Sequence, residues 1–187
     1  MGSSLEFALG SAVVVVTGVM ASGKTTVAQE LAEHLPRTVH VRGDMFRRMI
    51  VSGREELLPQ PDETPEAVVQ LRLRHRLSAT VADIYAEAGW TAVVQDVLLG
   101  KDLAEYVGTV RTRPLYVVVL APRPETVVVR EEEREKTGYG MWTVEELDRV
   151  LREETPRVGL WLDNSDQTPE ETVAAILADL DTARIPD

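Results

Sequence analysis

The eight residues from Gly18 to Thr25 constrain this chain more than any others. They read Gly-Val-Met-Ala-Ser-Gly-Lys-Thr and fit the pattern G-x-x-x-x-G-K-[ST]. In such a loop the glycines let the backbone wind around an anion with its N–H groups turned inward, while the lysine reaches the β- and γ-phosphates of a nucleotide and the hydroxyl ligates Mg²⁺. The run therefore predicts a phosphate-binding loop, also called a P-loop or Walker A motif.

The flanking residues supply the context that this loop requires. A valine-rich stretch at 12–17 reads as a strand, and residues 24–35 carry apolar residues at helical spacing, closed by Pro36. The N-terminal end of that helix adds a positive dipole to the same anion site. A chance match in a glycine-containing turn is the alternative. We expect the nucleotide to be bound by the loop and the first turn of the helix, through Gly18, Met20, Ala21, Ser22, Gly23, Lys24, Thr25 and Thr26.

Composition narrows the class of protein. A chain of 187 residues suits one domain, which we place at 12–187 after a weakly patterned leader at 1–11 that could be disordered. The chain has no cysteine, which excludes disulfides, zinc–thiolate sites and thiol nucleophiles. A net charge of −11 argues against nucleic acid as a partner. The chain also lacks a basic, apolar signal segment at its start and any apolar run of about 20 residues, so we expect a cytoplasmic protein with no membrane partner.

Strands and helices alternate along the whole chain. Further strands are predicted at 38–42, 91–95, 115–120 and 159–162, and further helices at 45–51, 65–88 and 124–136, with two more beginning at the capping-box patterns after Thr143 and Thr168. This alternation predicts an α/β fold with a parallel sheet and helices on both faces. Asp44 and Asp96 each follow a predicted strand, at the edge of an α/β sheet where ligands bind.

A charged helical pair with a glycine-rich tip is typical of a mobile lid. The predicted helix at 124–136 is heavily charged and breaks at Gly138-Tyr139-Gly140 before the next helix. We expect this tip to be mobile without ligand and to become ordered when ligands bind. Arg130 and Arg134 lie one turn apart on the helix before the tip.

These features together resemble the small P-loop kinases. The resemblance rests on the phosphate loop, Arg42-Gly43-Asp44, Gln95–Leu99, the arginines at 130 and 134, and Leu162–Ser165. Among these kinases the chain is most similar to the chloramphenicol-phosphotransferase-like group, with shikimate and gluconate kinases more distant. The chain departs from the pattern of this group at two places that bear on the acceptor. Gln95-Asp96 stands where chloramphenicol phosphotransferase has paired aspartates, and residues 52–76 match no known pattern.

The resemblance implies a three-layer α/β/α fold, with a five-stranded sheet in the order 2-3-1-4-5 and a helical lid. It also implies transfer of the γ-phosphoryl group of ATP, with Mg²⁺, to a hydroxyl of a small molecule. Lys24 would hold the β- and γ-phosphates, and Thr25 would ligate Mg²⁺. Asp44 would be the catalytic base or orienting acceptor for the substrate hydroxyl. The competing interpretation of Asp44 is a simple helix N-cap.

Other candidate residues keep two or more interpretations. Asp96 could contact Mg²⁺ through water or touch the substrate, support Thr25, or be a turn residue. Arg130 and Arg134 could clamp the migrating phosphoryl group, or could lie on an exposed helix laced by ion pairs. By resemblance, Arg123 could stack near the adenine and Asn164 could bind the nucleotide, although Arg123 could equally be solvated. The acceptor could be reached by Phe46, Arg47 and Arg48, and the two arginines could instead line a solvated helix face.

Three classes of function follow. The first is a kinase acting on an alcohol, either an antibiotic or a metabolite. The second is a nucleoside or nucleotide kinase, which the arginines at 47, 48, 72 and 76 would suit if the acceptor carries a phosphate. The third is a slow NTPase that acts as a switch, against which stand the absence of an Asn-Lys-x-Asp run and the position of Asp44. We expect a monomer or a homodimer with a small-molecule hydroxyl acceptor.

Overall fold

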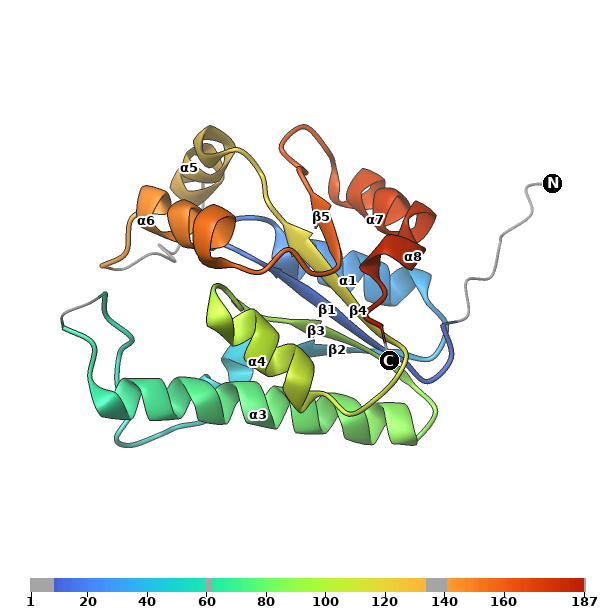
Figure 1. Cartoon of the computed structure of the whole chain (residues 1–187), viewed down its shortest axis with the longest axis horizontal. Coiled ribbons are helices and arrows are strands. Elements are labelled where there is room, and N and C mark those ends of the chain that lie inside the picture. The colour runs from blue at the N-terminus through green and yellow to red at the C-terminus, as the bar shows by residue number, and fades with distance from the viewer. Residues whose placement is uncertain (1–8, 60–61, 134–140, 187) are drawn as a thin grey trace.

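The computed structural model describes residues 9–59, 62–133 and 141–186, and shows a central parallel sheet covered by helices (Figure 1). The strands lie in the order β2-β3-β1-β4-β5, and every pairing is parallel. This confirms the fold class and the strand order expected from the resemblance. The strands are β1 Val13–Gly18, β2 Thr38–Arg42, β3 Thr91–Gln95, β4 Leu115–Leu120 and β5 Leu160–Leu162.

The helices fill the intervals between the strands. The first four are α1 Lys24–His34, α2 Gly43–Arg48, α3 Pro65–Glu87 and α4 Lys101–Thr109. The later ones are α5 Pro124–Glu132, α6 Val144–Arg149, the π-helical turn η1 Val150–Glu154, α7 Pro169–Ala178 and α8 Leu180–Ala183. The proposed lid tip and Arg134 lie outside the described residues, so the expectations for them stay predictions.

Capping residues begin the helices where the sequence predicted. The Thr64 hydroxyl accepts a hydrogen bond from the Ala67 amide at 3.1 Å, with Pro65 at the first helical position of α3. Both predicted capping boxes are formed, at Thr143 for α6 and at Thr168 for α7. These local bonds fix the starting points of three helices that surround the site.

The alternation of side chains along β1 divides the core into two halves. Val13 and Val15 pack in one buried cluster with residues of α3, α4 and α6, whereas Val14 and Val16 pack in the other with residues of α1 and α7. Both halves are needed because a central parallel strand is buried on its two faces. β1 lies between β3 and β4, which puts the phosphate loop at the middle of the carboxyl edge of the sheet.

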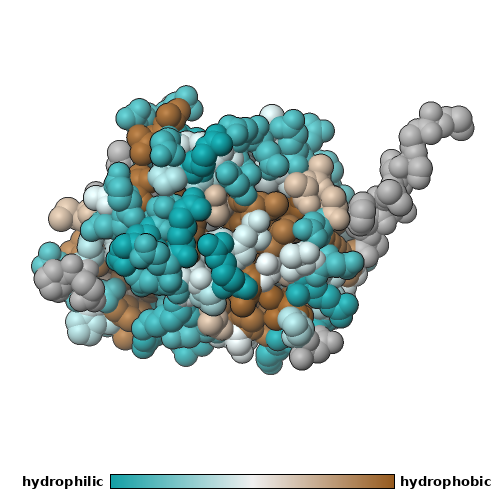
Figure 2. All heavy atoms as spheres, turned by 45° about the horizontal axis from the view of Figure 1, so that its top comes forward, coloured by the Kyte–Doolittle hydropathy of each residue, from teal (hydrophilic) through white to brown (hydrophobic). Residues whose placement is uncertain are grey.

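One face of the molecule, shown in Figure 2, is mostly hydrophilic. On the face shown in Figure 2, hydrophobic residues come to the surface only in small groups among hydrophilic ones. Within the described ranges, no helix combines the length and the apolar character that crossing a membrane would need.

Candidate active site

The phosphate loop has a geometry that only glycine permits at two positions. Gly18 ends β1 with φ 148°, and a Cβ atom there would lie 2.4 Å from the Leu120 carbonyl oxygen. Gly23 is the N-cap of α1 with φ 93°, in the left-handed region. The loop between them is closed by a hydrogen bond from the Ser22 amide to the Val19 carbonyl at 3.2 Å. The glycines of the motif are therefore required by the backbone path itself.

Lys24 and Thr25 stand at the start of α1 and line a cavity of about 570 Å³. The Lys24 side chain is folded along the loop, where its Nζ donates a hydrogen bond to the Val19 carbonyl oxygen at 2.6 Å. Gly23 supplies no side-chain cap, so the N–H groups of the first turn of α1 have no side-chain partner there, and residues of that turn line the cavity. The arrangement suits the phosphate groups of a nucleotide.

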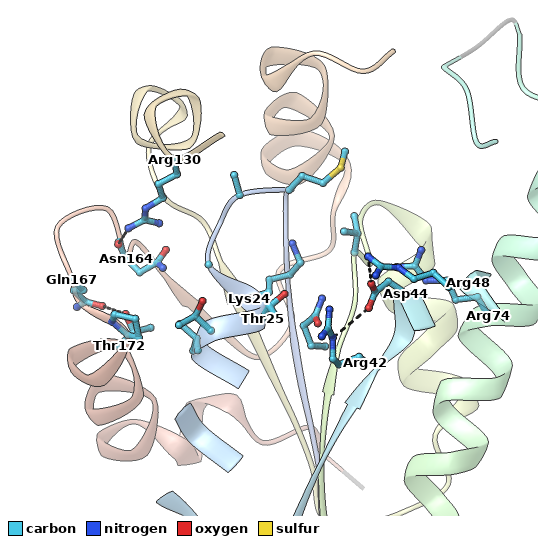
Figure 3. Close-up of a pocket in the computed structure, with 18 residues that line it drawn as sticks. Lys24, Thr25, Arg42, Asp44, Arg48, Arg74, Arg130, Asn164, Gln167 and Thr172 are labelled. Carbon is cyan, nitrogen blue, oxygen red and sulfur yellow. Dashed lines mark hydrogen bonds and ion pairs between the residues drawn. The ribbon is translucent and has the colours of Figure 1, made fainter. Parts of the chain in front are cut away.

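The cavity extends in both directions from these two residues (Figure 3). Asp44, Arg42 and Arg48, at the junction of β2 and α2, stand on one side of it. Gln167 and Thr172, at the start of α7, stand on the other side, with Arg130 and Asn164 above them. The cavity thus joins the two halves of the carboxyl edge of the sheet.

Asp44 lies in the first turn of α2 and does not cap the helix. The N-cap is Arg42, which provides no side-chain cap, so the N-cap interpretation of Asp44 is wrong. The Oδ2 atom of Asp44 is 2.9 Å from Nη2 of Arg48, and its Oδ1 atom is 3.7 Å from Nε of Arg42. Oδ1 is buried and accepts no hydrogen bond from the part of the chain described. One carboxylate oxygen of Asp44 is therefore left to accept a proton or a hydrogen bond from a ligand.

Arg130 reaches from α5 across to the phosphate loop. Its guanidinium donates to the Asn164 carbonyl oxygen at 2.8 Å and lies 3.5 Å from the Ser22 carbonyl oxygen. The buried Asn164 amide donates to the same Ser22 oxygen at 3.0 Å. Both side chains line the cavity, and together they fasten the loop to the segment after β5. Their direct contact with a nucleotide stays a prediction.

Arg123 lies outside the cavity. Its exposed guanidinium pairs with Asp166 at 2.6 Å, and its backbone N–H donates to the Ser165 hydroxyl. Hydrogen bonding to Asp166 raises the pKa of Arg123. The structure thus gives Arg123 a place at the surface of the segment after β5, and stacking on adenine stays a prediction.

Asp96 is fully buried at the end of β3, where Arg74 of α3 donates hydrogen bonds to both of its carboxylate oxygens. The Arg74 Nε atom donates to Oδ2 at 3.0 Å, and Nη2 donates to Oδ1. Gly43 packs against the same carboxylate so closely that a Cβ atom there would be 1.9 Å from Oδ2. Asp96 lines neither of the two cavities described, and its expected roles toward Mg²⁺ and substrate stay predictions.

A second cavity of about 510 Å³ adjoins the first. Met20, Arg74 and Val97 line both cavities, so the two are neighbours on either side of these residues. The Thr17 hydroxyl bonds both the amide and the carbonyl of Leu98, at 2.9 and 3.1 Å, which fixes the segment that carries Val97.

The structure also places the remaining predicted acceptor residues. Arg48 lines the first cavity, and Arg47 lines the second. Phe46 packs against the core cluster on the α3 side of the sheet and lines neither cavity. Arg72 and Arg76 are exposed on the outer face of α3.

The residues present fit a divalent cation beside a bound nucleotide. Mg²⁺ usually takes few protein ligands and keeps water and phosphate oxygens around it. The Thr25 hydroxyl lines the first cavity, and so does Gln95, whose buried Oε1 atom has no hydrogen-bond partner in the described residues. Thr25 with Gln95 could therefore help to hold the ion. No cluster of three or more His, Cys, Asp or Glu side chains suited to a metal occurs in the described ranges.

The lining residues that were not predicted as functional include the polar residues Arg74, Gln95, Gln167 and Thr172. Arg74 stands two positions from each of Arg72 and Arg76, which turns it to the opposite face of α3. The sequence could therefore have identified Arg74 from this offset together with the buried alanines of α3. Gln95 could have been found from its place at the end of β3, whereas no sequence pattern distinguishes Gln167 or Thr172.

Solved structures share this fold at low sequence identity. A sugar kinase from Janibacter sp. HTCC2649 has a TM-score of 0.65 and 24% identity, covering 92% of this chain and 95% of its own. The tunicamycin resistance protein of Deinococcus radiodurans has a TM-score of 0.66 and 15% identity, covering 94% and 99%. The APS kinase of Mycobacterium tuberculosis, solved with AMPPNP and APS, has a TM-score of 0.63 and 17% identity, covering 91% and 97%. These likenesses establish a P-loop kinase-like fold.

Two further comparisons concern the sequence. A UPF0200 protein of Aeropyrum pernix is 36% identical over 138 residues, which cover 72% of this chain and 71% of that protein. None of the comparisons singles out the chloramphenicol-phosphotransferase-like group, so that closer similarity stays a prediction. Residues 13–156 match the AAA domain family, and the chain therefore belongs to this family.

Proposed function

We propose that the protein is an ATP-dependent phosphotransferase that moves the γ-phosphoryl group of ATP to a hydroxyl of a small molecule. The observation that carries this proposal is the position of Asp44, whose Oδ1 atom has no hydrogen-bond partner in the described chain and whose side chain lines the phosphate-loop cavity. A switch that only hydrolyses a nucleotide has no need of a second cavity beside its phosphates. Kinases among the structural neighbours support the same interpretation.

The reaction asks mainly for positioning and charge neutralisation. Lys24 and the amides of the phosphate loop would hold the β- and γ-phosphates, and the Thr25 hydroxyl with Gln95 would help to hold Mg²⁺. The acceptor oxygen forms a bond to the γ-phosphorus, the bond from that phosphorus to the bridging oxygen breaks, and ADP leaves. Asp44 takes the proton of the acceptor hydroxyl on Oδ1.

Arg130 would complete the site from α5. Its guanidinium already lies at the loop, 3.5 Å from the Ser22 carbonyl oxygen, without any movement of the helix. A guanidinium at this place can neutralise charge on the transferring phosphoryl group. Bound ATP would then compete with the carbonyl oxygens that Arg130 contacts now.

Nucleotide binding is tested by Lys24→Ala. We expect at least a tenfold loss of ATP affinity in calorimetry and no phosphoryl transfer, because the charge that neutralises the phosphates is gone. Lys101→Ala is the matched control, since Lys101 is an exposed lysine at the start of α4 and lines neither cavity. An ATP affinity that is the same in Lys24→Ala and in the unaltered protein would contradict the proposal.

The acceptor is sought by measuring ADP formation with pooled nucleosides, nucleotides, sugars and antibiotics. We expect at least one pool to raise ADP formation well above the rate with ATP alone. A rate that no pool changes would favour the slow NTPase over the kinase.

A further inference from the structure

We propose that the second cavity holds the apolar body of an uncharged alcohol and excludes acceptors that carry a phosphate group. This inference rests on the proposed function, since it names the class of acceptor that the phosphotransferase would use. Two observations support it: apolar side chains line most of the cavity, and the arginines in its lining already form ion pairs.

Apolar side chains from four segments line most of the second cavity. They come from the loop before α3, from α3 itself, from the segment after β3, and from the region of α6, and comprise Leu57, Leu58, Leu71, Leu99, Trp142, Leu147 and Val150. The Trp142 Nε1 atom donates to the Leu57 carbonyl oxygen at 3.2 Å. This bond uses the only polar hydrogen of the indole, so the ring offers apolar surface to a ligand.

The arginines of the second cavity are already engaged. Arg74 donates from Nε and Nη2 to the two carboxylate oxygens of buried Asp96, so its charge is already paired and only part of its five N–H donors remains for another partner. Arg47 is 3.0 Å from a carboxylate oxygen of Glu56 and also donates to the Glu55 carbonyl. A phosphate would have to compete with these carboxylates for the charge of either arginine.

The charge balance in the second cavity also opposes an anion. Among the described residues, three carboxylates, Glu56, Glu63 and Asp102, line it together with two arginines, Arg47 and Arg74. Burial raises the pKa of Asp102, and the nearby His75 offsets only part of this rise. A phosphate dianion placed here would lose water and meet a net negative lining, which favours an uncharged ligand.

The position of the cavity explains how such a ligand would react. Met20, Arg74 and Val97 line both cavities, so a ligand in the second cavity can extend a polar end toward the phosphate loop. A volume of about 510 Å³ is within the range of sites for small organic molecules. The apolar body would give affinity, and the hydroxyl would be delivered toward Asp44.

Direct binding without ATP tests the class of ligand. The probes are 4-nitrophenyl β-glucoside and a panel of aryl alcohols, each compared with its phosphate monoester and with the same alcohol lacking the aryl group. We expect the aryl group to lower Kd at least tenfold and the phosphate to raise it at least tenfold. The proposal is overturned if the phosphate esters bind as well as the uncharged alcohols, or if the aryl group adds nothing.

A matched pair of variants on α3 locates the binding. Leu71→Gln puts a polar amide into the cavity lining and should raise the Kd of the best aryl alcohol about tenfold, which corresponds to about 1.4 kcal/mol. Leu77→Gln makes the same change on the exposed face of α3 and should leave that Kd unchanged. If Leu71→Gln does not fold, Val150→Thr keeps the shape of the side chain and serves instead. Equal Kd values in the cavity variant and in Leu77→Gln would overturn the proposal.

The same ligands separate this inference from the proposed function. If aryl alcohols bind as expected but never receive phosphate from ATP, the phosphotransferase fails and the class of ligand stands. If the acceptors that receive phosphate are phosphate esters, the phosphotransferase stands and this inference is overturned.

Discussion

At the scale of single residues, the proposed phosphoryl transfer depends most on Asp44. Asp44→Asn keeps the shape of the side chain but removes the charge that orients and deprotonates the acceptor hydroxyl. We expect turnover to fall by roughly 10²–10⁴-fold, the usual contribution of general-base assistance. ATP affinity should hardly change. Steady-state kinetics with a saturating acceptor measures the effect.

The stability of Asp44→Asn separates catalysis from structure. Asp44 pairs with Arg48 and Arg42 but caps no helix, and partly exposed pairs contribute roughly 0–1 kcal/mol. The variant should therefore unfold at nearly the same denaturant concentration as the unaltered protein. Asp181→Asn, on an exposed position of α8, is the control for the chemical change itself. If Asp44→Asn loses stability but keeps full turnover, the role of Asp44 is structural and not catalytic.

Gly43 gives a second prediction at this scale. A methyl group at position 43 would lie 1.9 Å from the Asp96 carboxylate, which is fully buried and gripped by Arg74. Gly43→Ala must therefore displace that pair, and we expect a loss of about 1–3 kcal/mol in the free energy of unfolding, as for overpacking of a core.

The matched control for Gly43→Ala is Gly108→Ala. Gly108 lies in α4, and a Cβ atom there meets nothing within 4 Å. That variant should gain roughly 0.5–1 kcal/mol, since alanine favours a helix more than glycine does. Chemical denaturation of both variants checks the signs. A neutral Gly43→Ala would mean that the packing around Asp96 is loose.

The sequence predicted some of these residues and missed others for a physical reason. Lys24 and Thr25 belong to a contiguous motif whose backbone path needs its glycines, so a local pattern identifies them. Arg74 pairs with Asp96, which is 22 residues away along the chain, and no local pattern predicts such a pair. The two arginines of α3 that the sequence suggested for a phosphate-bearing acceptor, Arg72 and Arg76, are exposed instead.

At the scale of elements, one carboxylate ties α3 to the chain before β4. Buried Asp83 accepts hydrogen bonds from the Arg111 and Thr112 amides and from the Thr112 hydroxyl. Burial alone would raise the pKa of Asp83, but the bonds from Thr112 and Arg111 outweigh it and lower that pKa. The folded protein therefore favours the ionised carboxylate.

The lowered pKa of Asp83 predicts a pH dependence. A carboxylate whose pKa is lower in the folded chain adds stability above its ordinary pKa of about 3.9, and this is lost as pH falls through the folded value. Asp83→Asn should thus be less stable at neutral pH by about 1–3 kcal/mol, with the difference shrinking in acid. Denaturation of Asp83→Asn and of the unaltered protein, repeated between neutral and strongly acidic pH, measures this difference in stability.

Glu87→Gln is the control for the Asp83 prediction. Glu87 pairs with the same Arg111 at 3.3 Å, but both side chains are exposed, so we expect a change of at most about 1 kcal/mol. Two results would contradict the stabilising role of ionised Asp83. One is a loss of stability in Glu87→Gln as large as that in Asp83→Asn, and the other is a stability difference between Asp83→Asn and the unaltered protein that does not shrink in acid.

Elements with strong local signals were predicted well. The strands at 38–42, 91–95 and 115–120 agree with the structure, and the caps at Thr64, Thr143 and Thr168 start their helices. The helix α4, Lys101–Thr109, was not predicted, because it is short and begins after Gly100 without a side-chain cap. Its buried Leu103 and Tyr106 give an amphipathic spacing that could have revealed it.

At the scale of the whole molecule, the strand order brings distant segments to one edge. β1 lies between β3 and β4, so the phosphate loop stands between Asp44 after β2 and Asn164 after β5. The alternation of strands and helices predicted the parallel sheet, and the resemblance implied the strand order that brings these segments together. The second cavity is assembled from segments scattered over residues 20–150, and apart from Met20 in the phosphate loop its lining belongs to no recognisable motif, so only the three-dimensional arrangement reveals it.

The most direct test of the account follows the γ-phosphoryl group itself. The protein is incubated with Mg²⁺, ATP labelled with ³²P at the γ-position and the pooled acceptors, and the label is located by chromatography. The account predicts that label moves onto an alcohol in the unaltered protein and that Lys24→Ala moves none. Label found only in inorganic phosphate, whichever pool is present, would contradict it.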